Sequence, residues 1–210
     1  MFLSTATAAL LLAVLPCLSL ALPQATSTTA ASTPTHTPLN TTRSYYLKTQ
    51  LSPRDQGRSR AHLDHLYLYS YHTGAGLNDV ALNASKTHAS KGFLNVTATV
   101  RFNYTTNANE TVPVTYQEFD LGNTWPYGMA LGYAATYAAW EPVTVNAGYG
   151  SGGFSVNATG LQVDEQSTGF GGWLACDWWH GVPQLFWMLK YYHDVIPSSC
   201  ATVNLVPEYI

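Results

Sequence analysis

Apolar and polar side chains alternate with a period of two residues along much of this chain, and the alternation restricts it to β-structure. The pattern is clearest in Phe93–Asn103, where every second residue from Leu94 is apolar and the residues between them are polar. Successive side chains of a strand point to opposite faces, so this segment is predicted to be a strand with one polar face. The polar loop that follows and a second alternation from Val112 predict a hairpin.

Six further segments are rich in β-branched and aromatic residues and are separated by Gly, Pro, Asn and Asp. These predicted strands are Tyr45–Leu51, His65–His72, Phe154–Val163, Trp173–Trp179, Leu185–Tyr192 and Ala201–Val206. Many short strands without helical spacers predict an all-β fold, a single-domain antiparallel β-sandwich with a jelly-roll-like organisation. The segment Tyr127–Trp140 combines alanines, glycines and aromatic residues, and we expect an irregular, aromatic-lined loop there.

The first residues have the pattern of an export signal. The run Ala8–Leu15 is apolar but too short to cross a membrane as a helix, and small residues precede a cleavage site after Ala21. We therefore expect a signal peptide over residues 1–21, a Ser/Thr/Pro-rich linker over 22–43 and one folded domain over 44–210. The mature chain is expected to be secreted, either extracellular or in the cell wall, without membrane attachment after cleavage.

The composition excludes one class of partner. Only 10% of the residues are charged and the formal net charge is −3. Nucleic-acid binding depends on clustered Lys and Arg, so no nucleic-acid partner is expected. The abundance of Tyr, Trp, Thr, Asn and Gly is typical of extracellular β proteins.

Export also determines how the cysteines and sequons are interpreted. Once Cys17 is removed with the signal peptide, Cys176 and Cys200 form an even pair in an oxidising compartment, which predicts one disulfide. Six N-x-S/T sequons predict N-glycosylation, and they begin at Asn40, Asn83, Asn95, Asn103, Asn109 and Asn157. Because glycans stay in water, an occupied sequon marks exposed surface, and the polar face of Phe93–Asn103 carries two of them.

Two carboxylates on one predicted strand carry the enzymatic hypothesis. Glu118 and Asp120 are two residues apart, so their side chains should leave the same face about 6.5 to 7 Å apart. Paired carboxylates at such a spacing can hydrolyse glycosidic bonds. A solvated strand face is the favoured interpretation, because hydrolase carboxylates usually come from different strands.

A second group of candidate binding or catalytic residues directly follows Cys176. It consists of Asp177, Trp178, Trp179 and His180. Three roles are open, in this order of preference: a structural hydrogen-bond cluster, a sugar-stacking site with polar anchors, or an acid/base pair. The three tyrosines Tyr67, Tyr69 and Tyr71 share one strand face. Such an aromatic stripe can stack against sugar rings, but we expect core packing, because the other face is also apolar.

Neither a metal nor a cofactor is expected. On a strand, the three-residue step between His62 and His65 would place them on opposite faces, and neither an H-E-x-x-H motif nor a carboxylate triad accompanies them or His72. The glycine-rich stretch Gly148–Gly153 leads into a predicted strand rather than a helix, so it is expected to be a turn rich in positive-φ positions instead of a dinucleotide site. No catalytic residue is assigned.

Three stretches carry a resemblance to a known family: YHTGAGLNDVAL at Tyr71–Leu82, CDWWHGVPQLFW at Cys176–Trp187 and PSSCATVNLVPEYI at Pro197–Ile210. Over roughly Ser44–Ile210 the chain resembles a family of small secreted proteins of filamentous fungi, catalogued as a domain of unknown function. The resemblance implies a fungal extracellular or cell-surface protein and supplies no catalytic residues.

These observations favour a non-enzymatic secreted glycoprotein that binds a cell-wall glycan or an extracellular protein at the cell wall or the host interface. One alternative is a carbohydrate-active hydrolase that uses carboxylates among Glu118, Asp120, Glu141 and Asp177. The other is a structural extracellular coat protein without a specific ligand. The sequence makes no prediction of the oligomeric state.

Overall fold

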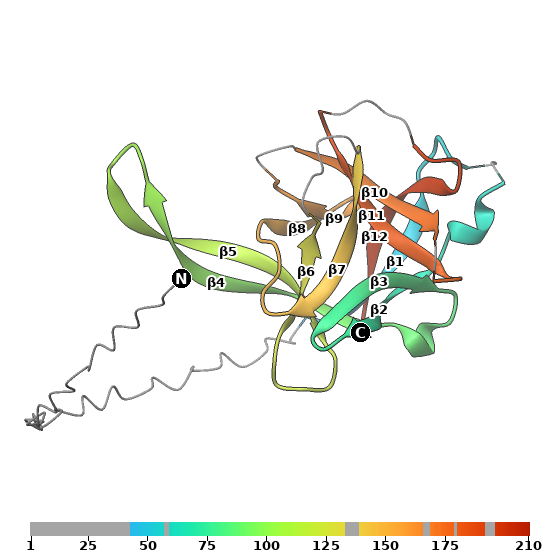
Figure 1. Ribbon diagram of the computed structural model, residues 1–210, viewed down its shortest axis with the longest axis horizontal. Helices are drawn as coiled ribbons and strands as arrows, with labels where there is room; N and C mark the ends of the chain where they lie inside the picture. The colour runs from blue at the N-terminus through green and yellow to red at the C-terminus, as the bar shows by residue number, and fades with distance from the viewer. Residues whose placement is uncertain (1–42, 57–58, 133–138, 166–168, 179, 192–195) are drawn as a thin grey trace, which may run out of the picture. The chain divides into compact units, whose positions relative to one another are not determined.

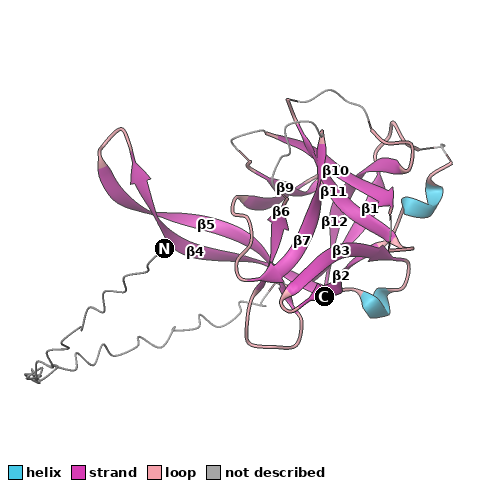
Figure 2. Cartoon of the chain, in the orientation of Figure 1, coloured by secondary structure: helices cyan, strands magenta, loops and turns pink. Residues whose placement is uncertain are grey.

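The protein is nearly all β-structure in the residues that the computed structural model describes, which are 43–56, 59–132, 139–165, 169–178, 180–191 and 196–210. These residues all belong to one compact unit, His36–Ile210. Figure 2 shows strands almost throughout, with two short 3-10 turns, η1 (Ala61–Leu63) and η2 (Lys86–His88). Within these ranges no helix has the length and apolar character needed to cross a membrane.

Twelve strands are present in the described residues (Figure 1). They are β1 (Tyr45–Leu51), β2 (Tyr67–Gly74), β3 (Leu77–Asn83), β4 (Lys91–Asn103), β5 (Ala108–Asp120), β6 (Tyr127–Leu131), β7 (Trp140–Ala147), β8 (Phe154–Asn157), β9 (Gly160–Val163), β10 (Phe170–Asp177), β11 (Pro183–Leu189) and β12 (Cys200–Tyr209). β1 coincides with the predicted strand Tyr45–Leu51. The other predicted strands differ from the observed ones at their ends, except Phe154–Val163, which forms β8 and β9.

Ten of these strands form one antiparallel sheet in the order β10-β12-β1-β2-β3-β11-β7-β6-β5-β4, and β8 and β9 form a separate hairpin. Additional pairings join β10 to β11 and β1 to β4. Because β10 pairs with both β12 and β11, six strands close into a ring, and the sheet faces itself across a core. The predicted single-domain antiparallel β-sandwich is thus confirmed as a sandwich-like fold with one disulfide.

The main buried cluster combines residues of the ring with residues of β5 to β9, and strand alternation determines which side chains join it. Leu47 on β1, Leu68 on β2, Val80 on β3 and Leu205 on β12 are each 0% exposed and belong to one buried cluster. Each such side chain contributes about 1.5–3 kcal/mol to stability when it leaves water. Trp173 joins the cluster and donates its indole N–H to the Leu161 carbonyl at 2.7 Å, which satisfies its polar atom inside the core.

Two segments differ from their predictions. Phe154–Val163 is a hairpin rather than one strand, because Asn157 accepts the backbone N–H of Thr159 at 2.8 Å and Gly160 has a φ of +107°. That φ is accessible to glycine and turns the chain back. The expected loop at Tyr127–Trp140 is wrong for β6, which pairs with β7 and β5, and residues 133–138 of that stretch lie outside the described residues.

The β4–β5 ribbon extends past the edge of the core (Figure 1). Its base is buried, with Phe93 only 1% exposed, whereas Val96 and Val100 farther along β4 are 62% and 64% exposed. The expected exposure of Asn95 is wrong, since this residue is 7% exposed. The predicted strand is confirmed, but its faces differ from the expectation: beyond the base the apolar series is exposed, whereas Thr97 and Thr99 on the polar face are partly buried.

Candidate functional site

The three tyrosines of β2 lie on the outer surface of the ring. Tyr67, Tyr69 and Tyr71 are each partly exposed, whereas Leu68 between them is fully buried. The expectation that these tyrosines form the core is therefore wrong. Both faces of β2 carry apolar residues, and closure of the ring places the leucine face inside and the tyrosine face outside.

The tyrosines are part of a longer series of rings, which we call the outer aromatic row: Tyr46, Tyr67, Tyr69, Tyr71 and His180. Ring centroids are 6.4 Å apart between Tyr46 and Tyr67 and 6.4 Å apart between Tyr69 and Tyr71. The imidazole of His180 lies at 4.3 Å from the Tyr71 ring with an interplanar angle of 31°. Residues two apart on a strand share a face, so Tyr67, Tyr69 and Tyr71 place these two groups of rings on the same side of β2.

Charged groups border one end of the row. The Tyr67 hydroxyl donates to Glu208 at 2.8 Å, and the Lys86 ammonium also donates to Glu208. These two hydrogen bonds lower the pKa of the Glu208 carboxyl, and the bond from Lys86 has the larger effect on that pKa. The ammonium groups of Lys86 and Lys48 each lie 5.1 Å from a ring centroid, over Tyr46 and Tyr67 respectively, within cation–π range.

A buried imidazole fixes the other end. Nε2 of His180 is 2.6 Å from Oδ2 of Asp79, and the His180 side chain is only 4% exposed. Asp79 lies on β3 directly opposite Tyr71, so one carboxylate holds the imidazole against the tyrosine ring. Sequence reasoning singled out His180 but missed Asp79, and their hundred-residue separation left no local signal of the contact.

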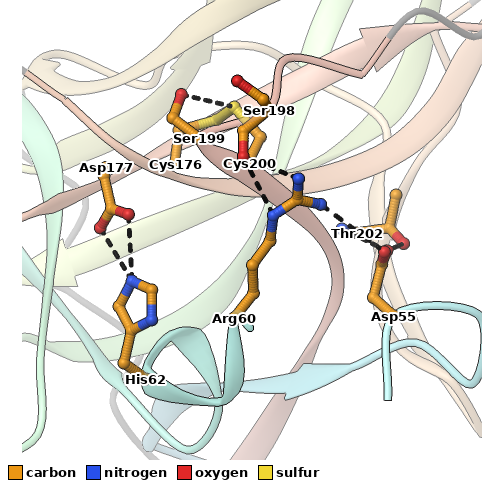
Figure 3. Close-up of a disulfide and its surroundings, with 9 residues drawn as sticks. All are labelled: Asp55, Arg60, His62, Cys176, Asp177, Ser198, Ser199, Cys200 and Thr202. Atoms are coloured by element: carbon orange, nitrogen blue, oxygen red, sulfur yellow. Dashed lines mark hydrogen bonds and ion pairs between the residues drawn. A yellow bond between two sulfur atoms is a disulfide. The ribbon is translucent and has the colours of Figure 1, made fainter. Parts of the chain in front are cut away.

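The residues expected to cluster after Cys176 have separate partners. Asp177 contacts Nε2 of His62 at 3.0 Å through both carboxylate oxygens, and both side chains are exposed (Figure 3). Trp178 packs edge-to-face against Phe186, with centroids 5.0 Å apart, and Trp140 lies against the same pair. Trp179 lies outside the described residues. Since Asp177 bonds to His62 while His180 bonds to Asp79, the geometry favours two structural contacts over one acid/base pair.

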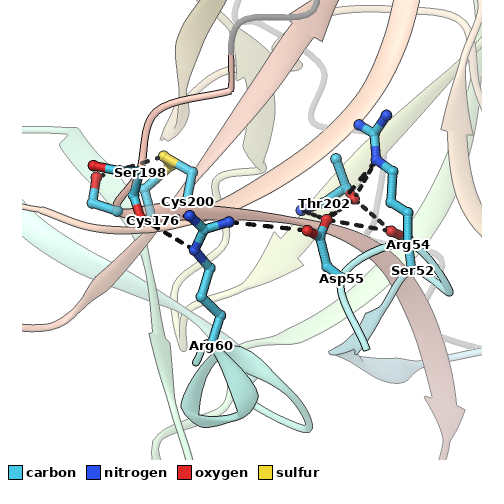
Figure 4. Close-up of polar contacts among 9 residues, drawn as sticks. Ser52, Arg54, Asp55, Arg60, Cys176, Ser198, Cys200 and Thr202 are labelled. Carbon is cyan, nitrogen blue, oxygen red and sulfur yellow. Dashed lines mark hydrogen bonds and ion pairs between the residues drawn. A yellow bond between two sulfur atoms is a disulfide. The ribbon is translucent and has the colours of Figure 1, made fainter. Parts of the chain in front are cut away.

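The predicted disulfide is confirmed. Cys176 on β10 and Cys200 on β12 are opposite each other in the register and bonded through sulfur, and both are fully buried. Nearby, Arg60 donates from two nitrogens to the Ser198 carbonyl, at 3.1 and 2.7 Å (Figure 3). Figure 4 shows that Asp55 accepts hydrogen bonds from Thr202, two residues beyond Cys200. This region is a structural anchor for β12.

The two carboxylates of β5 also have different surroundings. Glu118 is 0% exposed, and the Asn95 amide donates to both of its oxygens at 3.2 Å. Burial raises the pKa of Glu118, and the Asn95 hydrogen bond opposes that shift in part. The Gly122 N–H and, secondarily, Lys91 lower the pKa of Asp120. The expectation of a solvated face is therefore wrong for Glu118.

A groove of about 1010 Å³ lies beside the distal part of β5. Its wall includes residues of the glycine-rich stretch, where Gly148, Gly150 and Gly153 have positive φ as the sequence predicts. Apolar side chains such as Val114 and Phe154 share this wall with Asp164 and Glu165. Among the described side chains, no group of three or more His, Cys, Asp or Glu is arranged to hold a metal ion.

The sequons differ in accessibility. Asn109 and Asn157 are exposed and Asn83 and Asn103 are partly exposed, whereas the amide of Asn95 is buried against Glu118. Asn40 lies outside the described residues. Among the five sequon asparagines that the structure describes, Asn95 is thus the buried one, and the other four are at least partly exposed.

Comparison with known proteins gives one match. A family model described as "Domain of unknown function (DUF7907)" matches residues 42–209. The match agrees closely with the span over which the sequence resembles a domain of unknown function. No curated protein and no solved structure matches the chain.

Proposed function

This chain belongs to the family described as a domain of unknown function (DUF7907), and we propose that it is a secreted protein that binds a cell-wall glycan along the outer aromatic row. Two features support export: the N-terminal segment with the pattern of a signal peptide and the disulfide, since disulfides persist in oxidising compartments.

The observation that carries the proposal is the partial exposure of Tyr67, Tyr69 and Tyr71 on one strand face. A tyrosine offers an apolar ring with a polar tip, which matches a sugar ring with its apolar C–H face and peripheral hydroxyls. Binding sites combine such aromatic surface with a few fixed polar groups, and here Asp79 and Glu208 lie at the two ends. Pairing with His180 and Lys86 fixes these carboxylates before any ligand arrives.

The hydrolase alternative has less support. Glu118 and Asp120 bind Asn95 and Lys91 respectively, and Asp177 is paired with His62 on the surface. Glu141 lies on β7 opposite Trp187 of β11. A glycosidase needs two carboxyl groups that flank one bond, whereas these four residues have separate environments. If no glycan binds, two hypotheses remain: binding of an extracellular protein, and a structural coat protein without a specific ligand.

The proposal predicts that loss of one ring weakens binding. Tyr69→Ala and Tyr71→Ala should each reduce affinity for the bound polysaccharide about tenfold or more, as expected for a contact worth about 1.4 kcal/mol. Pull-down on purified wall polysaccharides would identify the glycan, and affinity electrophoresis would measure the change.

Tyr104→Ala is the matched control, because Tyr104 is 90% exposed at the tip of the β4–β5 ribbon and is not part of the row. Its affinity should equal that of the unmodified sequence. Equal binding by all three variants, with unchanged circular dichroism spectra, would exclude the row as the site. Absence of binding to every polysaccharide would exclude the glycan function itself.

A further inference from the structure

The distal half of the β4–β5 ribbon exposes an apolar face. Val96, Val100 and Phe102 of β4 are 62%, 64% and 47% exposed. Their partners in the register of β5 are Thr115, Thr111 and Asn109, so this face carries no charged residue along that length. We call it the apolar ribbon face.

Such a face is unfavourable in water unless something covers it. Exposed apolar patches promote association, and an open strand edge beside them adds unpaired backbone groups. Over the described residues, the only pairing of β4 apart from β5 is with β1, at Gly92 near its base. The distal ribbon therefore has both an apolar face and an open edge.

One sequon lies on this face. Asn109 is directly opposite Phe102 in the register, and Thr111, the third residue of its sequon, is opposite Val100. Directly opposed residues of an antiparallel pair have Cβ atoms about 4.5–5.5 Å apart. A group attached to the Asn109 amide therefore starts beside the Phe102 ring.

The amide of Asn109 is also available. The amides of Asn95 and Asn103 donate to Glu118 and Glu110, at 3.2 and 2.8 Å. Asn109 is exposed, and its amide nitrogen forms no hydrogen bond within the described ranges. Phe102 is held edge-on by Tyr104, with centroids 5.1 Å apart, which steadies the ring.

We propose that Asn109 carries an N-linked glycan whose first N-acetylglucosamine ring packs on Phe102, so that the glycan covers the apolar ribbon face and prevents association between copies of the chain. The apolar C–H face of the sugar lies against the aromatic ring, and the outer sugars provide a hydrated, bulky cover. The inference rests on export of the chain and is independent of ligand binding at the outer aromatic row.

The attachment needs the secretory pathway's lipid-pyrophosphate-linked oligosaccharide as co-reactant. A bond forms between C1 of the first sugar and Nδ2 of Asn109 while the C1–O bond to the lipid pyrophosphate breaks. The pyrophosphate leaves with the bonding electron pair, and the amide loses one proton.

The test uses the full chain produced in a eukaryotic secretory host. Glycopeptide mass spectrometry should find Asn109 occupied, and Asn109→Gln should shift the mass measured by light scattering towards larger species as concentration rises. Asn157→Gln, which removes a sequon in the β8–β9 turn, should behave like the unmodified sequence. The double variant Asn109→Gln with Phe102→Ser should associate less than Asn109→Gln alone, because the ring at the centre of the proposed contact is gone.

A second measurement covers the case in which Asn109→Gln is not exported. Endoglycosidase trimming of the folded protein to single N-acetylglucosamine residues should increase association only in part, because the first ring still covers Phe102 while the outer sugars are lost. Complete removal by an amidase should increase association. An unmodified Asn109, or equal association of the Asn109→Gln and Asn157→Gln variants, would overturn the proposal.

Discussion

Two carboxylates on the same face of β5, Glu118 and Asp120, have pKa values shifted in opposite directions by their surroundings. Glu118 is opposite Phe93 and Asp120 is opposite Lys91, so one is enclosed by the base of the ribbon and the other is beside an ammonium group. Burial raises the pKa of Glu118, whereas the Gly122 N–H and Lys91 lower the pKa of Asp120. The two groups should therefore affect stability in opposite directions as the pH changes.

Replacement of Glu118 by Gln should stabilise the fold at neutral pH. The unfolded chain releases the Glu118 proton near the ordinary pKa of 4.5, while the folded chain retains it to higher pH. Folding stability therefore falls as pH rises from the unfolded to the folded pKa, and the loss persists above it. Glutamine is always neutral and can still accept from Asn95. The melting temperatures of Glu118→Gln and of the unmodified sequence should be equal near pH 4, and towards pH 7 that of Glu118→Gln should become the higher one.

Asp120→Asn is the control, with the opposite sign. A lowered folded pKa contributes stability that is present above the ordinary value of 3.8 and is lost as pH falls through the folded pKa. The variant should thus melt below the unmodified sequence at pH 7, with a difference that shrinks in acid. If both variants shifted in the same direction at pH 7, the assigned environments would be wrong.

The short turn after β1 anchors β12 through Asp55. Asp55 is 1% exposed and accepts the backbone N–H of Thr202 at 2.9 Å as well as its hydroxyl. Nitrogens of Arg54 and Arg60 lie 3.9 Å from its carboxylate (Figure 4). This buried, charge-assisted contact ties the segment after β1 to the strand that carries Cys200.

Loss of that contact should be costly. Asp55→Ala should lower the free energy of unfolding by about 3 kcal/mol, because it leaves the buried Thr202 N–H without its acceptor and removes charge-assisted hydrogen bonds. Asp177→Ala breaks an exposed pair with His62 and should cost at most about 1 kcal/mol. Urea unfolding at pH 7 measures both, and equal costs would contradict the anchoring role of Asp55.

The elements themselves were only partly predictable from the sequence. β4 alternates without interruption from Leu94 to Asn103, and β1 is rich in aromatic and β-branched residues, so the local sequence is enough to identify both. β3 and β7 were missed, because Asn78, Asp79 and Pro142 interrupt their patterns, and tertiary pairing makes these segments strands. Phe154–Val163 is predicted as one strand, but the chain turns after Asn157, whose side-chain oxygen accepts the Thr159 N–H.

In the whole molecule, closure of the six-strand ring determines which face of each of its strands is buried. A sequence with two apolar faces, as in β2, does not distinguish them, because both the leucine and the tyrosine series satisfy strand periodicity. The pairing of β10 with β11, which is distant from β2 in the sequence, closes the ring. The local pattern of β2 carries no information about this closure, so the sequence favours a core position for the tyrosines over an exposed aromatic stripe, and the structure shows the reverse.

Neighbouring substitutions on β2 test this inside-outside arrangement directly. Leu68→Ala should lower the free energy of unfolding by about 2–5 kcal/mol, as expected when a fully buried leucine leaves a cavity. Tyr69→Ala should cost only about 1 kcal/mol, because its ring is partly exposed in the native state and less surface returns to water on unfolding. Denaturant unfolding of both variants gives the comparison, and a tyrosine variant as unstable as the leucine variant would mean that the tyrosine series faces the core.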